Sequence, residues 1–502
     1  MSSTKAYIHA TIITVNKRRD VILDGAVVVQ GSRIVALGKT KDVLANFKDI
    51  EHYDCAGRII IPGLINTHAH LAQSLLRGLA EDLSLHPWLC DAIWPLEANY
   101  AENDGYIAAV LTIVEMLKSG TTCFLEAMLT HRSGIENVVR AVEETGIRGC
   151  IVSRAAQRCS QALISQYTLA NGFGQGKLVK SIETNPNLNM TDARDRDVAS
   201  MSIDSALAAH QTYNGAFNDR LHIWFAAGTP RGSSITAHSA IGDTAKQHNI
   251  GITMHCAEAP ADLTIYRTQY DRSPLEFCRT ANLTGPKTVL AHVVHPEPET
   301  DYEIMHESGT TVSHNPTSNC KLGSGISPIP DMIKAGVNVA LGTDGAPCNN
   351  TYDMFREMHL AGVLHSGVRQ TAGAINAYTV LEMATINGAR ALGLDAEIGS
   401  LEFGKKADFV VVNPAWYNSA PWDSEQLENT DVPGVDPITV IVHSCTGSDV
   451  ETVVVDGQIL VEKGKVMGIN ESDIEKMARQ AVLGIRQRAG VGAQNNMGLH
   501  YC

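Results

Sequence analysis

The sequence lacks long hydrophobic runs, clustered basic residues and paired cysteines. No stretch approaches the roughly 18 uninterrupted apolar residues of a transmembrane helix, so no membrane span is expected. The net charge is −14 and no lysine- or arginine-rich run occurs, which argues against nucleic acid or an anionic membrane as the main partner. The 11 cysteines have no paired spacing, and the first residues lack a signal-peptide pattern. A cytoplasmic protein with reduced thiols is therefore expected.

The middle of the chain instead contains a recurring unit of amphipathic helix, glycine and β-rich strand, as in IVEMLKSGTTCFLEA at 113–127. A glycine directly after the helical pattern suits a left-handed C-cap. The strands predicted from these units are 59–66, 121–126, 147–153, 222–227, 251–256, 288–292, 310–314 and 337–342. Eight strands alternating with helices favour an α/β fold, a (β/α)8 TIM-like barrel over residues 61–399. An open doubly wound sheet is also compatible with the pattern.

The two ends of the chain have a different character. Short β runs joined by Asp-Gly and Lys-Gly turns are typical of antiparallel strands. Residues 1–60 and 400–470 are therefore predicted to combine into one small β-sandwich beside the barrel. Residues 471–502 are predicted to hold a helix over 473–489 and a polar tail, and the Gly/Asn-rich segment 165–200 to form a long loop.

The segment PGLINTHAHLAQSLLRG, at 62–78, places His68 and His70 two positions apart after an apolar run. On a strand, residues i and i+2 face the same side, so both imidazoles would point together. Taken alone, the pair is also compatible with an accidental arrangement in a loop.

Further histidines and acids follow other predicted strands. His255 ends the fifth strand with Glu258 three residues later, His292 ends the sixth, and Asp344 follows the eighth. In an α/β barrel the carboxyl ends of the strands converge on one face, where active sites lie. The pair, a third histidine and the aspartate converging there would make a nitrogen and oxygen site suited to zinc or iron.

These residues stand within longer motifs that resemble a known family. The matching stretches are PGLINTHAH, LLRGLAEDLSLHPWL, IWPLE, GTTCFLE, HCAE, AHVVH, VSHNPTSNCKLGSGISPI, LGTDGAPCNN, ATINGARALGL and IGSLEFGKKADFVVV. In this order they resemble the amidohydrolase superfamily over most of residues 5–465. The resemblance is to its branch of S-adenosylhomocysteine and adenosine-type deaminases, guanine deaminases and triazine hydrolases.

The resemblance implies a metal centre and named catalytic residues. One divalent metal, zinc or alternatively iron, is expected on the ligands His68, His70, His255 and Asp344. Some relatives bridge two metals by a modified lysine on the fourth strand, but that strand here reads HIWFAAGTP, which favours one metal. The resemblance further makes Glu258 the proton shuttle and places His292 beside the metal-bound water, in reach of the substrate.

These residue types suit hydrolytic deamination. A metal with an open position lowers the pKa of bound water towards about 7 and so provides hydroxide at neutral pH. Asp344 can take the water proton, and a protonated Glu258 can donate to a ring nitrogen of the substrate. Hydroxide then attacks the adjacent carbon, ammonia leaves, and His292 holds the developing oxyanion.

Four residues are candidates for substrate binding. Glu97, in IWPLE, matches the acid that accepts hydrogen bonds from ribose hydroxyls in nucleoside-type relatives; otherwise it is a first-turn helix acid. Trp88 would stack on a planar ring or simply pack, and Gln73 would face the substrate or solvent. Arg154 falls where homocysteine-binding relatives have an arginine.

The predicted function is that of a metal-dependent aminohydrolase, a deaminase of an amino-substituted N-heterocycle, purine or purine nucleoside-like. Residues 228–231 read GTPR where nucleoside-type relatives have His-Ala-Pro-Tyr, so the substrate class is less secure than the reaction. The alternatives are a triazine-type hydrolase displacing chloride or alkylamine, a guanine deaminase, and an inactive binding or assembly protein. The intact set of site residues argues against the last. A homodimer is a family-level expectation.

Overall fold

The computed structural model describes residues 4–47, 49–101, 103–130, 132–154, 202–230, 234–415, 417–424 and 434–490. Two sequence predictions lie outside these residues: the long loop at 165–200 and the polar tail beyond residue 490.

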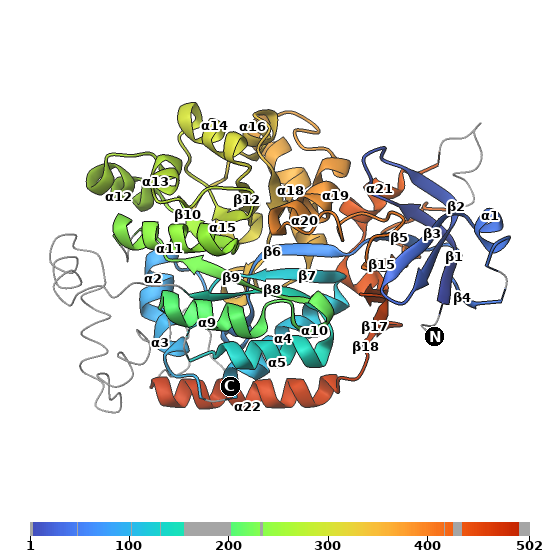
Figure 1. The fold of residues 1–502 in the computed structure, drawn as a ribbon, viewed down its shortest axis with the longest axis horizontal. Helices are drawn as coiled ribbons and strands as arrows, with labels where there is room; N and C mark the ends of the chain where they lie inside the picture. The colour runs from blue at the N-terminus through green and yellow to red at the C-terminus, as the bar shows by residue number, and fades with distance from the viewer. Residues whose placement is uncertain are drawn as a thin grey trace, which may run out of the picture.

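A parallel sheet forms the centre of the molecule (Figure 1). Its strands are β6 (Leu64–His70), β7 (Thr121–Glu126), β8 (Arg148–Arg154), β9 (Leu221–Ala227), β10 (Ile252–Cys256), β11 (Thr288–His292), β12 (Thr311–His314), β13 (Val339–Leu341) and β14 (Asp344–Gly345). From β6 to β13 each strand pairs with the strand that follows it in sequence, and β14 pairs with β6. Since only residues 342–343 separate β13 from β14, the two are halves of one eighth strand, and the predicted α/β barrel is confirmed.

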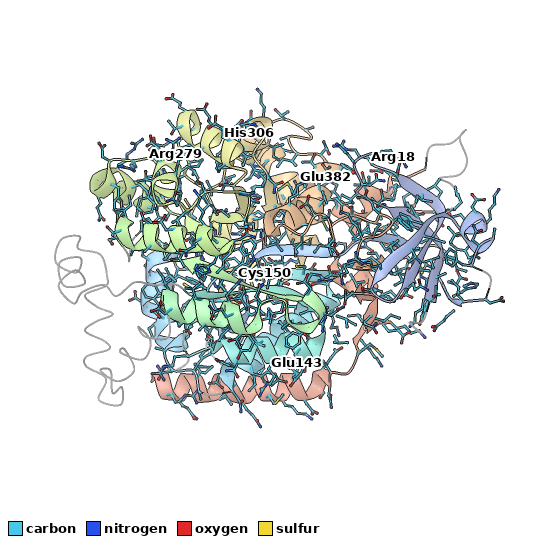
Figure 2. All side chains as sticks on the ribbon, viewed as in Figure 1. Arg18, Glu143, Cys150, Arg279, His306 and Glu382 are labelled. Carbon is cyan, nitrogen blue, oxygen red and sulfur yellow. The ribbon has the colours of Figure 1, made fainter. Side chains whose placement is uncertain are left out.

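Helices cover the outside of this sheet, and their inner faces pack on it. The helices of at least seven residues around the barrel are α4 (Asp104–Lys118), α5 (Ile135–Thr145), α9 (Ile203–Tyr213), α11 (Ile235–His248), α12 (Pro260–Tyr270), α13 (Pro274–Thr280), α14 (Pro298–Ser308), α18 (Met354–Arg369), α19 (Ala377–Ala384) and α20 (Ile386–Leu392). Figure 2 shows the resulting division: Cys150 of β8 lies in the interior, whereas Glu143, Arg279 and His306 lie on the outer surface.

Both ends of the chain build a second, mixed sheet. Its strands are β1 (Thr4–Ile13), β2 (Val21–Gln30), β3 (Arg33–Lys39), β4 (Glu51–Asp54), β5 (Ile59–Pro62), β15 (Phe409–Val412), β16 (Val450–Val455), β17 (Gln458–Glu462) and β18 (Lys465–Val466). Period-two alternation divides its side chains, because Ile60 and Phe409 enter the sheet's own core whereas Ile61 and Val410 face the barrel core. The small β domain built from both ends is therefore confirmed, while the exact domain limits stay a prediction.

One predicted strand is wrong in its limits. Residues 59–66 do not form a single barrel strand, because β5 belongs to the mixed sheet and β6 to the barrel. The chain changes sheet at Gly63, where an added Cβ would lie 1.9 Å from the Thr122 hydroxyl oxygen. Since both strands are buried, the apolar run continues across the break and hydropathy could not locate it.

The last described helix is α22 (Glu471–Ala489), where the sequence predicted a helix over 473–489. It packs along α4 (Figure 1), and a 2.5 Å ion pair joins Lys118 to Glu471 near its start. Acidic residues in its first turn and Arg486 and Arg488 in its last complement the helix dipole. In the described part of the chain, no helix is both long and apolar enough to cross a membrane.

Candidate active site

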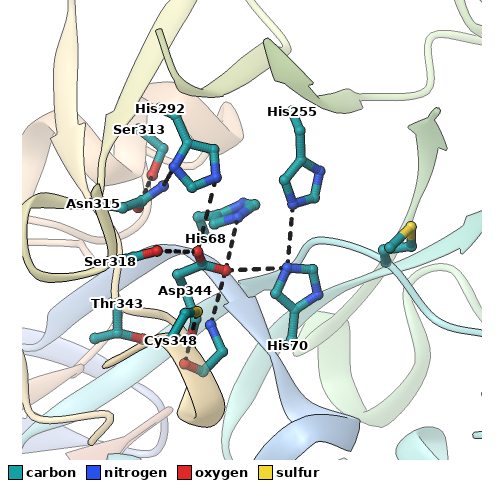
Figure 3. A network of polar contacts seen from close by, with 12 residues as sticks. His68, His70, His255, His292, Ser313, Asn315, Ser318, Thr343, Asp344 and Cys348 are labelled. Carbon is teal, nitrogen blue, oxygen red and sulfur yellow. Dashed lines mark hydrogen bonds and ion pairs between the residues drawn. The ribbon is translucent and has the colours of Figure 1, made fainter. Parts of the chain in front are cut away.

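The ends of four strands bring the predicted metal ligands together with His292 (Figure 3). His68 and His70 come from the end of β6, His255 from β10 and His292 from β11, while Asp344 begins β14. Their parallel strands end on one side of the barrel, so side chains distant in sequence meet. His292 and Asp344 have φ values of 72° and 65°, a strained conformation of the kind that gathers at functional sites.

The distances describe a compact donor set. The Asp344 Oδ1 atom lies 3.2 Å from His70 Nε2 and 3.4 Å from His68 Nε2. The Nε2 atoms of His70 and His255 are 3.3 Å apart, and His292 Nε2 lies 3.9 Å from Asp344 Oδ2. One ligand atom from each of His68, His255, His292 and Asp344 can be chosen so that all lie within 4.8 Å of one another.

Two of these nitrogens are buried without a hydrogen bond. The Nε2 atoms of His68 and His292 make no hydrogen bond to any residue that the structure describes. Buried polar atoms without partners are rare in folded proteins and call for an explanation such as an ion. Imidazole nitrogens with one carboxylate are a donor set typical of zinc and other divalent transition metals, so the residues fit a metal.

The protonation states follow from burial and neighbouring charge. Burial lowers the pKa of His68 to about 4, and burial together with the other histidines lowers that of His255 well below its usual range. Burial opposes ionisation of Asp344, but contacts with His68 and His70 hold its pKa well below the ordinary value. Burial also disfavours charge on His70, yet Asp344 raises its pKa to about 9. A bound metal would take the place of that His70 proton.

Other residues, which the sequence did not assign to the site, hold the side chains of Asp344 and His292 in place. The Ser318 hydroxyl donates to Asp344 Oδ2 at 2.6 Å, and Asn319 Oδ1 lies 2.8 Å from His292 Nδ1. If His292 Nδ1 carries the proton, its Nε2 atom presents a lone pair to the site. Ser318 thus holds the Asp344 carboxylate in place. Their position in the sequence could have indicated this role, because both residues follow the carboxyl end of β12.

Glu126, at the end of β7, is another such residue. Its carboxylate accepts the backbone N–H groups of Leu71 at 2.6 Å and Met128 at 3.0 Å. Its Oε1 atom also lies 3.9 Å from His70 Nδ1. Burial raises the pKa of Glu126 to about 7. The acid thus fixes the backbone directly after His70.

The predicted proton shuttle, Glu258, lies beside the donor set. Glu258 is 3% exposed, and its Oε1 atom is 3.8 Å from His292 Nε2. Its backbone N–H donates to Asp262 Oδ2 at 3.0 Å, and Ala257 before it has a φ of 47°. This local turn directs Glu258 back towards the histidines.

Two of the predicted substrate residues contact each other. Gln73 lies in η1 (Leu71–Leu76), directly after His70, and its Nε2 atom donates to Glu97 Oε1 at 3.0 Å. Gln73 is 3% exposed, so the solvent-facing alternative is wrong.

Trp88 is buried, and its indole N–H has no acceptor within the described parts of the chain. The side chain of Arg154 lies outside the described residues.

Known proteins agree with this architecture. The model of the amidohydrolase family matches residues 59–460, which is most of the chain. The chain belongs to the amidohydrolase family. A 5-methylthioadenosine/S-adenosylhomocysteine deaminase of Acetivibrio thermocellus is 33% identical over 468 residues, covering 93% of this chain and 96% of that protein. A 5'-deoxyadenosine deaminase of Methanobrevibacter smithii is 33% identical over 460 residues, covering 92% and 93%.

Solved structures are similar over nearly the whole length. An adenosine deaminase from Xanthomonas campestris with bound zinc has a TM-score of 0.81 and 25% identity, covering 97% of this chain and 99% of that one. An atrazine chlorohydrolase from Arthrobacter aurescens has a TM-score of 0.79 but 21% identity, which shows a shared fold alone. The predicted amidohydrolase, a metal-dependent deaminase and hydrolase of carbon–nitrogen bonds, is thereby confirmed, and the reading as an inactive assembly protein is set aside.

Proposed function

We propose that this amidohydrolase deaminates adenosine-like nucleosides and releases ammonia at a single zinc ion. The observation that carries the proposal is the convergence of buried histidines and Asp344 at the strand ends, with Glu258 3.8 Å from His292. The deaminase relatives at 33% identity support the nucleoside class. The triazine alternative has only a likeness of fold behind it.

The proposed ligands are His68, His70, His255 and Asp344. We prefer His70 to His292 as the fourth because its Nε2 atom lies 3.2 Å from Asp344, against 3.9 Å for His292. β9 contains no lysine, which supports one metal rather than a bridged pair. Zinc is preferred over iron because imidazole and carboxylate ligands suit it and the adenosine deaminase neighbour carries it.

The chain's own residues would then move the protons. A bound divalent metal supplies water of lowered pKa. The Asp344 carboxylate, whose pKa is held well below its usual value by contacts with His68 and His70, would accept a proton from that water. Glu258 can donate to the ring nitrogen beside the carbon under attack, and His292 can donate to the developing oxyanion from Nε2 when it carries a proton there. The buried setting strengthens each of these interactions by excluding water.

We expect one equivalent of zinc per chain. The donor set has one carboxylate at its centre and no bridging lysine on β9, so a second ion would lack ligands. Metal analysis of the purified protein, before and after chelation and with zinc added back, measures this. Two equivalents would contradict the mononuclear proposal, as would full activity with no metal at all.

The nucleoside proposal depends on Glu97. If the carboxylate binds the ribose diol, ribosides should react faster than their free bases, and Glu97→Ala should slow ribosides far more. A hydrogen bond to a charged group contributes about 1.5–3 kcal/mol, which corresponds to tenfold or more in kcat/KM for ribosides. Ammonia release from matched adenosine-type ribosides and bases, with guanine and triazines alongside, measures the preference.

The matched control for this variant is Glu136→Ala, which removes an exposed acid from the first turn of α5. It should leave both rates unchanged. A wild-type preference for free bases, with Glu97→Ala indifferent to the sugar, would refute the nucleoside class. Turnover of guanine or triazines would then identify the substrate.

Two expectations concern the location of the protein in the cell and its oligomeric state. A cytoplasmic location is supported by the cysteines, since those that the structure describes are all unpaired thiols. A homodimer is expected from the family.

A further inference from the structure

The barrel closes through a very short pairing. β14 has two residues, and its register with β6 sets Asp344 opposite Ala69 and Gly345 opposite His70. This seam between the first and last strands carries three of the four proposed metal ligands, His68, His70 and Asp344. Two residue pairs form few backbone hydrogen bonds, so the pairing of β14 with β6 by itself fixes the relative position of the two strand ends only weakly.

One buried phenol bridges the seam. The Tyr352 hydroxyl donates to the His70 carbonyl oxygen at 2.7 Å and accepts the Ala346 N–H at 3.2 Å. His70 ends β6, and Ala346 comes directly after β14. Tyr352 is fully buried. One oxygen atom therefore joins the two strand ends next to the ligands, while Asn66 and Thr67 of β6 hold the earlier part of the seam through Thr343 and Leu341.

Tyr352 is itself held in place from outside the barrel. Its backbone N–H donates to Glu115 Oε1 at 2.9 Å, and the Thr351 hydroxyl donates to the same atom at 3.0 Å. Glu115, on α4, also pairs with Arg77, which directly follows η1. Because η1 begins right after His70, these contacts form a closed circuit that runs from His70 through Tyr352, Glu115 and Arg77 back to His70.

We propose that Tyr352 is a positioning residue of the metal centre, which sets His70 against Asp344 by fixing the seam of the barrel. The inference rests on the ligand set of the proposed function. In Tyr352→Phe the ring would still fill its site, but the His70 carbonyl would lose a donor and the buried Ala346 N–H its acceptor. Loss of such an outer contact typically weakens metal binding about 10–100-fold.

The test compares wild type, Tyr352→Phe and a matched control, Tyr100→Phe. Tyr100 is also a buried tyrosine; its hydroxyl donates to the Ala72 carbonyl in η1, not to the residues of the seam. Zinc affinity is measured by chelator competition on metal-free protein, and ligand geometry by the visible absorption of the cobalt-loaded protein. Tyr352→Phe should bind zinc about 10–100-fold more weakly and alter the cobalt spectrum, with Tyr100→Phe like wild type.

Equal zinc affinity in Tyr352→Phe and wild type, or equal weakening in both variants, would overturn the role of Tyr352. Should Tyr352→Phe fail to fold, Glu115→Gln tests the same circuit of contacts at the residue that holds the Tyr352 backbone. This variant should also weaken zinc binding. An unchanged affinity there would contradict the inference. Wild type that binds no zinc would refute the proposed function and this inference with it, whereas zinc binding unaffected by Tyr352 refutes the inference alone.

Discussion

Glu258→Gln is expected to keep its metal and lose about 10²–10⁴-fold in kcat. The carboxylate is not among the proposed ligands, and its Oε1 atom lies 3.8 Å from His292 Nε2, where a proton donor to the substrate ring is needed. Glutamine keeps the shape of the side chain but cannot give up and regain a proton. The variant should therefore fold and bind zinc as the wild type does.

Steady-state ammonia release, with metal content measured on the same samples, checks this expectation. Glu357→Gln is a matched control, because Glu357 is also a buried acid, whose pKa burial raises to about 7. Its carboxylate accepts from Asn349 at 2.8 Å and lies outside the donor set. Glu357→Gln should retain kcat within a few-fold, whereas comparable turnover in Glu258→Gln would mean that another group carries the proton.

Asp344→Asn should lose both metal and turnover, with kcat/KM falling by more than about 10⁴-fold. Asp344 is the carboxylate of the donor set, lying 3.2 Å from His70 Nε2 and 3.4 Å from His68 Nε2. Asparagine removes the negative charge that offsets the metal and the group that accepts the water proton. Two functions of one side chain are lost, so the effect should exceed that of Glu258→Gln.

Metal content and kcat/KM, each measured with and without excess zinc, separate the two losses. Excess zinc should refill part of the Asp344→Asn sites without restoring turnover, because the proton acceptor is still missing. Ser318→Ala is the comparison, since it removes only the 2.6 Å hydrogen bond to Asp344 Oδ2 and should cost far less. Full metal content and near wild-type rates in Asp344→Asn would place both functions elsewhere.

Several features of the site could be predicted from the sequence because their cause is local. The recurring helix–glycine–strand unit indicates a parallel barrel, and a barrel directs the carboxyl ends of its strands to one face. His68, His255, His292 and Asp344 each lie at or near the end of a recognisable apolar strand. Their meeting within 4.8 Å therefore follows from strand order, with no knowledge of individual contacts.

The remaining features were decided by tertiary structure, because they depend on contacts between residues far apart in the chain. Hydropathy reports burial but not which sheet a buried strand joins, so the change of sheet at Gly63 was hidden in one apolar run. The Gln73 bond to Glu97 and the Ser318 bond to Asp344 arise only when separate loops pack together. Tyr352 lies 282 positions from His70, and no local pattern marks a phenol whose partners are two backbone groups brought together by closure of the barrel.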